Sequence, residues 1–367
     1  MAPFDISVIV PTLNEEAALP ALLRDLQDQV DVSFEVLVAD GGSDDRTVEL
    51  AREFTCVRVL TCGRGRGRQM NDAARAARGA YLFFLHADTR LTSDAFLRLA
   101  RDALDAARQA AGHDRVAGHC RLEFDRRDRR RHPVAFRYAE EKMAFDRPHV
   151  VNGDQGLLLT PGFFDTLGGF DESLGFLEDQ RIAADIRSHG RWVLLPGTLR
   201  TSARRFEAAG FYRLYILMAM LMGLYWAGAS AFFERLPDVY RQQRDLGMGK
   251  LLLTPFFREI RTMLRVDYGV RGTLRLVVKI GRFVRSHSWQ MFYFVDIWLR
   301  PVLGPRRYPF LTVHDTVFVK LTNFAVFDLL AGLFAVVWFL GILAPVYARL
   351  DRRALGEQAR AARAHQA

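Results

Sequence analysis

Residues 80–89 read "AYLFFLHADT", an apolar run that ends abruptly in a histidine and an aspartate. A short run rich in aromatic side chains is typical of a buried β-strand. A carboxylate at the tip of such a strand, here Asp88, is well placed to hold a metal ion or a substrate. The alternative is a polar residue that only caps the next turn.

This strand is the fourth in a regular alternation of strands and helices. The strands are too apolar for either face to be exposed to solvent. Such an alternation therefore predicts an α/β fold with a parallel sheet covered by helices. We expect strands at 6–10, 35–40, 57–61, 81–85, 116–124 and 155–160. We expect helices at 17–29, 44–54, 68–79 and 93–111.

Polar residues cluster where these strands end, and ligands of such sheets bind beyond the carboxyl ends of the strands. In "PTLNEE", Pro11 and Asn14 turn the chain and Glu15 is placed to face a ligand, although Asn-Glu is also a common helix start. In "ADGGSDDRT", Asp40 can accept hydrogen bonds from a ribose or a base, and Gly41 allows the backbone to approach closely.

The stretch "GRGRGRQMN" (63–71) lacks the GxGxxG spacing of a dinucleotide loop and has no Walker lysine. We interpret it as an arginine-bearing loop that neutralises phosphate charge. Arg68 opens a helix at the ligand edge and Asn71 is expected to turn toward the ligand. Arg64 and Arg66 are equally consistent with a solvent-exposed basic loop.

Asp88 and Asp40 would lie on the same rim of the sheet. A Mg²⁺ or Mn²⁺ ion held by Asp88 would bridge two phosphate oxygens and stabilise a departing diphosphate, because these cations prefer hard oxygen ligands. His86 either contacts the metal shell or only fills space.

Together these motifs resemble a known family. The segments "SVIVPTLNEE", "VLVADGGSDDRT", "GRQMNDAA" and "FLHADT" resemble the nucleotide-binding half of a GT-A fold glycosyltransferase of family 2, with "HAD" standing where that family has its DxD motif. The segment "GGFDESLGFLEDQRIAADIRSHGR" resembles the acceptor half. "TSARRF" followed by "GFYRLYI" is similar to a bacterial subgroup named radical-SAM/selenodomain-associated transferases. The resemblance spans 6–240.

The resemblance implies an inverting displacement at the anomeric carbon of a nucleotide-diphosphate sugar. Asp179, in the Glu178-Asp179 pair, would deprotonate the acceptor hydroxyl. Three acids, Asp40, Asp88 and Asp179, are expected to share one cleft. Further residues predicted at the donor or the acceptor are Arg204, Arg205, Asn152, Asp154 and Gln155. Trp192 is interpreted as a core residue.

After the first half, the alternation of strands and helices gives way to long apolar segments and a basic, aromatic-rich region. We expect a catalytic domain over 1–210, a buried or interfacial hydrophobic helix within 211–245, and a basic, aromatic helical region over 246–367. That region contains a candidate transmembrane helix at 325–347, long and apolar enough to cross a bilayer. Arginines follow it, which indicates a cytoplasmic tail. The catalytic half and the C-terminal tail would then lie on the same side of the membrane. This requires an even number of crossings, so we expect either two spans or a re-entrant, interfacial arrangement.

The N-terminal residues contain no basic segment with a cleavage site, and the three cysteines show no CxxC spacing. We therefore expect reduced thiols and an enzyme at the cytoplasmic face of the inner membrane. The net charge of +9 favours anionic partners: nucleic acid, phosphorylated small molecules or an anionic membrane surface. The resemblance implies a nucleotide-sugar donor, and the apolar C-terminal region and basic loops indicate a lipid or polyprenyl-phosphate acceptor. Nucleic acid is not expected, because the arginines are dispersed and no known binding motif is present.

Two alternative functions remain. A sugar-1-phosphate nucleotidyltransferase would carry a glycine-rich, arginine-containing signature after the first strand, where this chain has "PTLNEE". A non-catalytic, membrane-associated scaffold of the same fold would bind no nucleotide.

Overall fold

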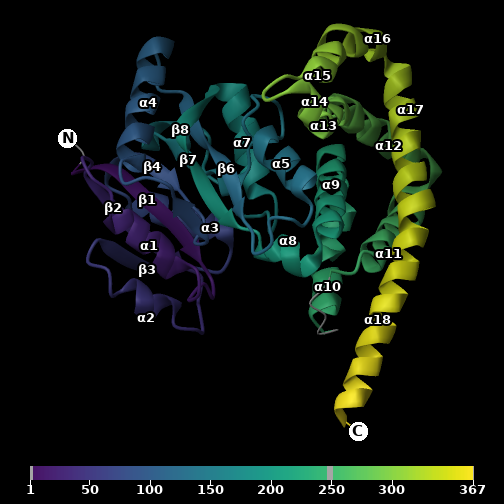
Figure 1. Ribbon diagram of the computed structural model, residues 1–367, viewed down its shortest axis with the longest axis horizontal. Coiled ribbons are helices and arrows are strands. Elements are labelled where there is room, and N and C mark those ends of the chain that lie inside the picture. Colours follow the sequence, from purple (N-terminus) through teal and green to yellow (C-terminus); the bar gives the residue numbers. More distant parts are fainter. Residues whose placement is uncertain (1–2, 246–250, 367) are drawn as a thin grey trace. The chain divides into compact units, whose positions relative to one another are not determined.

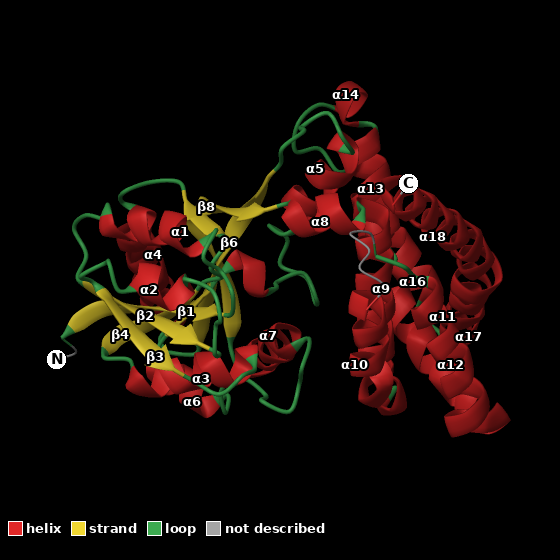
Figure 2. Cartoon of the chain, turned by 90° about the horizontal axis from the view of Figure 1, so that it is seen from below, coloured by secondary structure: helices red, strands yellow, loops and turns green. Residues whose placement is uncertain are grey.

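The computed structural model describes residues 3–245 and 251–366 and divides the chain into two units, Met1–Ala203 and Arg204–Ala367 (Figure 1). The boundary precedes the expected domain end at 210. The first unit contains all the β-strands of the described chain, and the second contains only helices (Figure 2).

The first unit is built on a sheet with the strand order β3-β2-β1-β4-β7-β6-β8-β5. The strands are β1 (Phe4–Thr12), β2 (Phe34–Asp40), β3 (Val57–Thr61), β4 (Gly79–Phe84), β5 (Thr89–Leu91), β6 (Val116–Asp125), β7 (Leu157–Leu159) and β8 (Arg191–Ser202). The four strands β1–β4 are parallel, as predicted. Beyond them the sheet is mixed, because β7 runs antiparallel to both β4 and β6 and β5 runs antiparallel to β8.

Helices cover both faces of this sheet (Figure 2). They are α1 (Leu19–Gln27), α2 (Thr47–Ala51), α3 (Arg66–Ala76), α4 (Phe96–Ala111), α5 (Pro133–Lys142), α6 (Pro161–Thr166) and α7 (Glu178–His189). Ile9 and Leu82 of the sheet pack against Met70 of α3, Phe163 of α6 and Ile182 of α7 in one buried cluster. This packing fixes the first turns of α3 and α7, which carry the polar residues of the site.

The second unit contains α8 (Arg204–Ala209), α9 (Phe211–Ala227), α10 (Ser230–Asp245), α11 (Thr254–Met263), α12 (Gly269–Ser286), α13 (Trp289–Trp298), α14 (Arg300–Leu303), α15 (Pro309–Val313), α16 (Val319–Thr322), α17 (Ala325–Val336) and α18 (Ala344–Gln366). The single hydrophobic helix predicted within 211–245 is two helices. Gly228, with a φ of 77°, ends α9 in the left-handed conformation that favours glycine. One face of α9, which includes Leu217, Leu221 and Leu224, is buried in the core of this unit, whereas Tyr212 and Met218 are exposed.

Small residues and one buried charge hold α12 against α17. A Cβ on Gly281 would lie 1.6 Å from the carbonyl oxygen of Asp328, and a Cβ on Gly332 would lie 2.1 Å from that of Val277. The two helices therefore approach backbone to backbone. The buried Asp328 carboxylate accepts hydrogen bonds from Nε of Arg285 at 2.6 Å and Nε of Arg282 at 3.3 Å.

One continuous helix in the described chain, Ala325–Glu357, is long and apolar enough to cross a membrane. It has 33 residues, and only 17% of its most apolar window, with mean hydropathy 2.4, is buried inside the protein. A span needs about 20 apolar residues. The helix includes the predicted segment 325–347 and continues beyond it.

Candidate active site

Two interlocked turns form the rim above β1 and β2. Asn14, at a φ of 57°, accepts a hydrogen bond from the Asp44 N–H at 2.9 Å and donates its own N–H to Ser43. The Glu15 N–H donates to the Thr47 hydroxyl at 2.8 Å. These bonds fix the positions of the residues after Pro11 at the carboxyl ends of the strands, where the sequence predicts them.

The buried Asp40 carboxylate shapes its own turn. It accepts hydrogen bonds from the N–H groups of Gly42 and Ser43, both at 3.0 Å, and from the Ser43 hydroxyl. The close approach expected at Gly41 is made by the Gln69 side chain, which lies 3.0 Å from the position of an added Cβ. The roles of Asp40 and Gly41 toward a nucleotide stay predictions.

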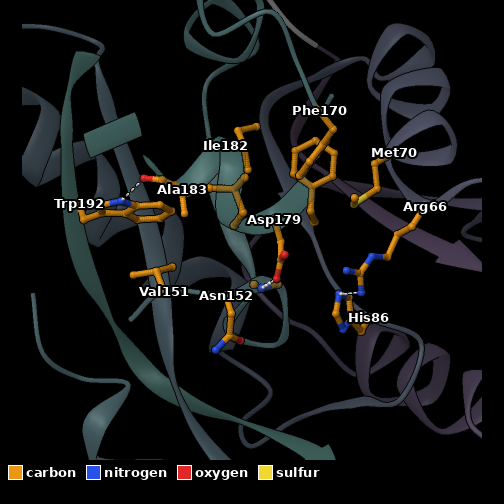
Figure 3. A pocket seen from close by; sticks show the side chains of 14 residues that line it. Arg66, Met70, His86, Val151, Asn152, Phe170, Asp179, Ile182, Ala183 and Trp192 are labelled. Atoms are coloured by element: carbon orange, nitrogen blue, oxygen red, sulfur yellow. Dashed lines mark hydrogen bonds between the residues drawn. The ribbon is translucent and has the colours of Figure 1, made fainter. Parts of the chain in front are cut away.

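Next to this rim is a cavity of about 30 Å³ at the tips of β4 and β7 and the start of α7 (Figure 3). Its lining residues are Arg66, Met70, Phe84, His86, Val151, Asn152, Gly153, Gly156, Leu157, Phe170, Asp179, Ile182, Ala183 and Trp192. Of the three acids expected to share one cleft, Asp179 lines this cavity, whereas Asp40 and Asp88 are not among its lining residues.

Asp179 is held in the first turn of α7. One carboxylate oxygen accepts a hydrogen bond from the Gly153 N–H at 2.8 Å, and the other accepts from the Gln180 N–H at 2.8 Å. A helix N-terminus favours negative charge. The half-buried carboxylate is thus oriented toward the cavity (Figure 3).

Arg66 brings positive charge to the same cavity. Its Nε donates to the buried carboxylate of Glu178. Desolvation lowers the pKa of Arg66, but the neighbouring carboxylates of Glu178 and Asp179 outweigh it and raise the pKa above its ordinary value. The guanidinium therefore stays charged beside Asp179.

His86 lies between Arg66 and Asp154. Its Nε2 is 3.4 Å from Nη1 of Arg66 (Figure 3). Its Nδ1 is 2.8 Å from a carboxylate oxygen of Asp154. Arginine can only donate and an ionised carboxylate can only accept, so the neutral tautomer with hydrogen on Nδ1 satisfies both contacts. The Nε2 lone pair then faces a guanidinium, which is a poor setting for a metal ligand.

Asp88 is half-buried in the turn between β4 and β5. Within residues 3–245 and 251–366, no group of three or more His, Cys, Asp or Glu side chains is arranged to hold a metal ion. The metal-binding role of Asp88 stays a prediction.

The segment Asn152–Gln155 forms a short 3₁₀ turn with reciprocal caps. Asn152 lines the cavity and its side chain accepts from the Asp154 N–H at 3.2 Å, whereas Gln155 is fully buried. The Gln155 amide donates to the carbonyl oxygens of Met143 and Cys120 and contacts His119 at 3.0 Å. Gln155 thus supports the turn from below.

Other predicted donor residues have contacts of their own. The Asn71 side chain donates to the Phe170 carbonyl at 2.8 Å and to Glu172, and it accepts from the Phe170 N–H, so it anchors that loop. Arg68 is exposed, with Nε 3.9 Å from Asp72. Arg204 and Arg205 begin α8 in the second unit. The donor-binding roles of these four residues stay predictions.

Two residues of the cavity were not predicted. Sequence reasoning favoured Arg68 over Arg66, but it is Arg66 that meets Glu178, a partner 112 positions away. Trp192 is half-buried: it packs against the buried cluster of the sheet, in keeping with its interpretation as a core residue, and it also lines the cavity. The alternation of "RWVLLP" within a strand could have indicated that one face of this strand is open.

We expect Arg66→Gln to reduce activity about tenfold or more, because a preorganised charge at a reacting centre is lost. It should also lower the melting temperature, since the buried Glu178 carboxylate loses its partner. The double variant Arg66→Gln with Glu178→Gln should recover the melting temperature without recovering activity. Arg64→Gln, in the exposed part of the loop, is the control. Equal activity in Arg66→Gln and Arg64→Gln would contradict the assignment of Arg66 as a charge that contributes to activity.

His119 makes the fold acid-sensitive. Burial lowers its pKa from 6.5 to about 4, so the unfolded chain binds a proton more readily than the folded one. The free energy of unfolding should therefore be fully present above pH 6.5 and should fall, by up to about 3 kcal/mol, as the pH drops toward 4. Urea unfolding at pH 7.5 and pH 5 tests this. His119→Asn should show a smaller difference between the two; an unchanged difference would refute the role of His119.

Residues 7–159 match the family model described as "Glycosyl transferase family 2". The chain is 36% identical over 107 residues to "PGL/p-HBAD biosynthesis glycosyltransferase" of Mycobacterium tuberculosis, covering 27% of this chain and 42% of that protein. It is 33% identical over 132 residues to "Undecaprenyl-phosphate 4-deoxy-4-formamido-L-arabinose transferase" of Pseudomonas aeruginosa, covering 33% of this chain and 37% of that protein. The chain thus spans less than half the length of these relatives.

Among solved structures, the mannosyltransferase PcManGT from Pyrobaculum calidifontis, in complex with GDP-Man and Mn²⁺, aligns with a TM-score of 0.44 and 18% identity. The alignment covers 91% of this chain and 87% of that one.

Proposed function

We propose that this chain, which carries a glycosyltransferase family 2 domain over residues 7–159, is an inverting glycosyltransferase that moves a sugar from a nucleoside-diphosphate donor to an acceptor hydroxyl or phosphate. The observation that carries the proposal is the placement of Asp179. Its carboxylate faces a cavity at the strand tips, in the first turn of α7, beside the charged Arg66.

In this reaction Asp179 accepts the proton of the attacking acceptor group, and the diphosphate leaves from the opposite face of the sugar. A positioned base contributes about a hundred- to ten-thousandfold to such a step. Arg66 offsets negative charge near the reacting centre, and Glu178 and His86 hold its guanidinium in place.

Asp88 would hold a Mg²⁺ or Mn²⁺ ion, which neutralises the charge of the departing diphosphate when it is bound. His86 is not assigned to the metal, because its two ring nitrogens are directed at Asp154 and Arg66. The rim formed by Pro11, Asn14, Glu15, Asp40 and Gly41 would hold the nucleotide.

The acceptor is proposed to be lipid-linked, and the enzyme is proposed to act at the cytoplasmic face of a membrane. The largely exposed apolar helix Ala325–Glu357 supports attachment to a bilayer. The name of the Pseudomonas aeruginosa relative, an undecaprenyl-phosphate transferase, supports a polyprenyl-phosphate acceptor.

A thermal-shift panel of UDP- and GDP-sugars, with and without Mn²⁺ or Mg²⁺, tests the donor assignment. A true donor should raise the melting temperature, because a ligand that binds only the folded state stabilises it by mass action. At a hundredfold excess of donor over its Kd, the gain in apparent free energy of unfolding is about 2.7 kcal/mol. Metal should enlarge the shift, and Asp88→Asn should abolish that enlargement. No shift with any nucleotide sugar would favour the scaffold alternative.

Flotation with liposomes tests the membrane assignment. The full chain should float with vesicles, and a chain truncated before Ala325 should lose most of this binding because it lacks the exposed apolar helix. Recovery of the full chain in the soluble fraction after a carbonate wash would oppose an integral span.

A further inference from the structure

A second cavity, of about 80 Å³, adjoins the first and shares Val151, Ala183 and Trp192 with it as lining residues. One side of it is a face of α7, formed by residues at positions 180, 183, 184 and 187. This spacing places four side chains on one stripe of a helix. The other side is the segment 147–151. The mechanism described above uses neither the side chain of Gln180 nor the side chains of residues 147–150.

A buried hydrogen-bond acceptor without a partner lines this cavity. Gln180 is 6% exposed, and its Nε2 donates to the Val151 carbonyl at 3.0 Å. Its Oε1 has no hydrogen-bond partner within the described part of the chain. Because the Val151 carbonyl oxygen can only accept, the amide group of Gln180 that faces it must be the NH2 group, and this assigns the other atom as the oxygen Oε1. Buried polar atoms are rarely left unpaired, so Oε1 calls for a ligand group that donates, such as a hydroxyl.

The same cavity has a basic end. Arg147, His149 and Arg187 contribute to its lining. Nη2 of Arg187 donates to the Asp146 carboxylate at 2.6 Å and to the Arg147 carbonyl at 3.3 Å, which fixes the guanidinium in the wall. Arg147 and Arg187 thus place two guanidinium groups in the lining of this end of the cavity. A planar, fixed guanidinium suits the oxygens of a phosphate.

Trp192 supplies the apolar wall between the two cavities. Its Nε1 donates to the Ala183 carbonyl at 3.2 Å, so the polar end of the indole is satisfied within the protein (Figure 3). The ring contacts His119 and the buried cluster, and it also lines both cavities with an apolar surface. The cavity therefore combines a hydroxyl-accepting oxygen, a phosphate-binding end and a wall that suits the apolar face of a sugar ring.

We propose that this second cavity, defined by Gln180, Arg147, Arg187 and Trp192, is an acceptor subsite for a hydroxyl-bearing phosphate ester. The inference rests on the proposed function, because the subsite adjoins the cavity that holds Asp179. Gln180 accepts a hydrogen bond from a ligand hydroxyl, and the arginines bind its phosphate. The ester is either a soluble sugar phosphate or the headgroup of a phospholipid that carries hydroxyl groups.

Isothermal titration of the full chain, with no donor present, tests the subsite. Inorganic phosphate and glucose 1-phosphate should both bind, and glucose should bind at least tenfold more weakly than glucose 1-phosphate. Arg187→Gln should weaken both phosphate probes at least tenfold. Gln180→Met should weaken glucose 1-phosphate and leave inorganic phosphate unchanged. Arg181→Gln, an exposed arginine on the same helix, is the matched control and should bind as the unmodified chain does.

Absence of phosphate binding, or full binding in Arg187→Gln, overturns the proposal. Hydrogen exchange on the unmodified chain decides the matter even if a variant does not fold. Glucose 1-phosphate should slow exchange in peptides that cover 147–151 and 178–189, and protection confined to other segments overturns the proposal. Competition by phosphatidylinositol vesicles, but not phosphatidylcholine vesicles, assigns the site to a lipid headgroup; competition by neither assigns it to a soluble ester. Because no donor is present, failure here leaves the donor thermal-shift result, and with it the proposed function, untouched.

Discussion

Replacing Asp179 by asparagine is expected to reduce sugar transfer by about a hundred- to ten-thousandfold, the range typical of a lost general base. The amide is similar in size, but its single oxygen can accept a hydrogen bond from only one of the Gly153 and Gln180 N–H groups, and its NH2 group then faces the other N–H. The melting temperature of the variant therefore checks that the turn keeps its shape. The amide cannot take the proton of the acceptor. The loss should therefore fall on the transfer rate at saturating donor rather than on donor affinity.

The measurement is initial-rate transfer, together with the donor-induced thermal shift of the same preparation. Asp185→Asn is the matched control, because Asp185 lies on the same helix and pairs with the exposed Arg181 at 3.0 Å. Asp185→Asn should retain transfer. An Asp179→Asn enzyme with near-normal turnover would exclude Asp179 as the base.

The second large effect is expected at Gly281. A single methyl group in Gly281→Ala would lie 1.6 Å from the Asp328 carbonyl oxygen, which no side-chain adjustment can relieve because the neighbour is backbone. The helices α12 and α17 must separate. Overpacking usually costs about 1–3 kcal/mol and occasionally more, and we expect this variant at or above the upper end.

Thermal unfolding of the full chain in detergent measures this effect. Gly341→Ala is the control, since its added methyl group would meet nothing closer than 3.8 Å, at Val337. Replacing glycine inside a helix by alanine is worth up to about 1 kcal/mol, so this control should be neutral or stabilising. Equal melting temperatures for the two variants would show that α12 and α17 do not pack as described.

The first half of the fold could be predicted from the sequence because each element carries its own local signal. The strands β1–β4 are apolar runs, the intervening helices have apolar positions at helical spacing, and polar turns follow the strand tips. The antiparallel pairing of β7 could not be predicted in this way. Leu157–Leu159 has only three residues, and its direction depends on a pairing with β4 and β6 that no local pattern encodes.

The site was predictable to the extent that its residues follow strand tips or begin a helix, as His86 and Asp179 do. It was not predictable where the function of a side chain depends on a distant partner. Arg66 and Arg68 both lie in the first turn of α3, each preceded by a glycine, and only the position of Glu178 distinguishes them. The second cavity likewise requires α7 and the segment 147–151 to meet.

The second unit was hardest to predict, because its helices are joined by long-range polar contacts. The Asp351 carboxylate of α18 accepts the N–H groups of Leu253 and Thr254 at the start of α11 and also binds Arg213 of α9. Such contacts link residues about a hundred positions apart. From the sequence alone, the arginine involved could not be distinguished from an exposed surface charge.

The pairing of Asp328 with Arg282 and Arg285 has a consequence for biogenesis. Asp328 stands in the first turn of the most apolar helix of the described chain, where an unpaired carboxylate would resist transfer into hydrocarbon. Its partners lie on α12, which is synthesised earlier, so the neutralising arginines already exist when α17 emerges from the ribosome. Under the proposed attachment of α17 to a bilayer, a nascent chain without α12 would present Asp328 with neither of these two arginines beside it.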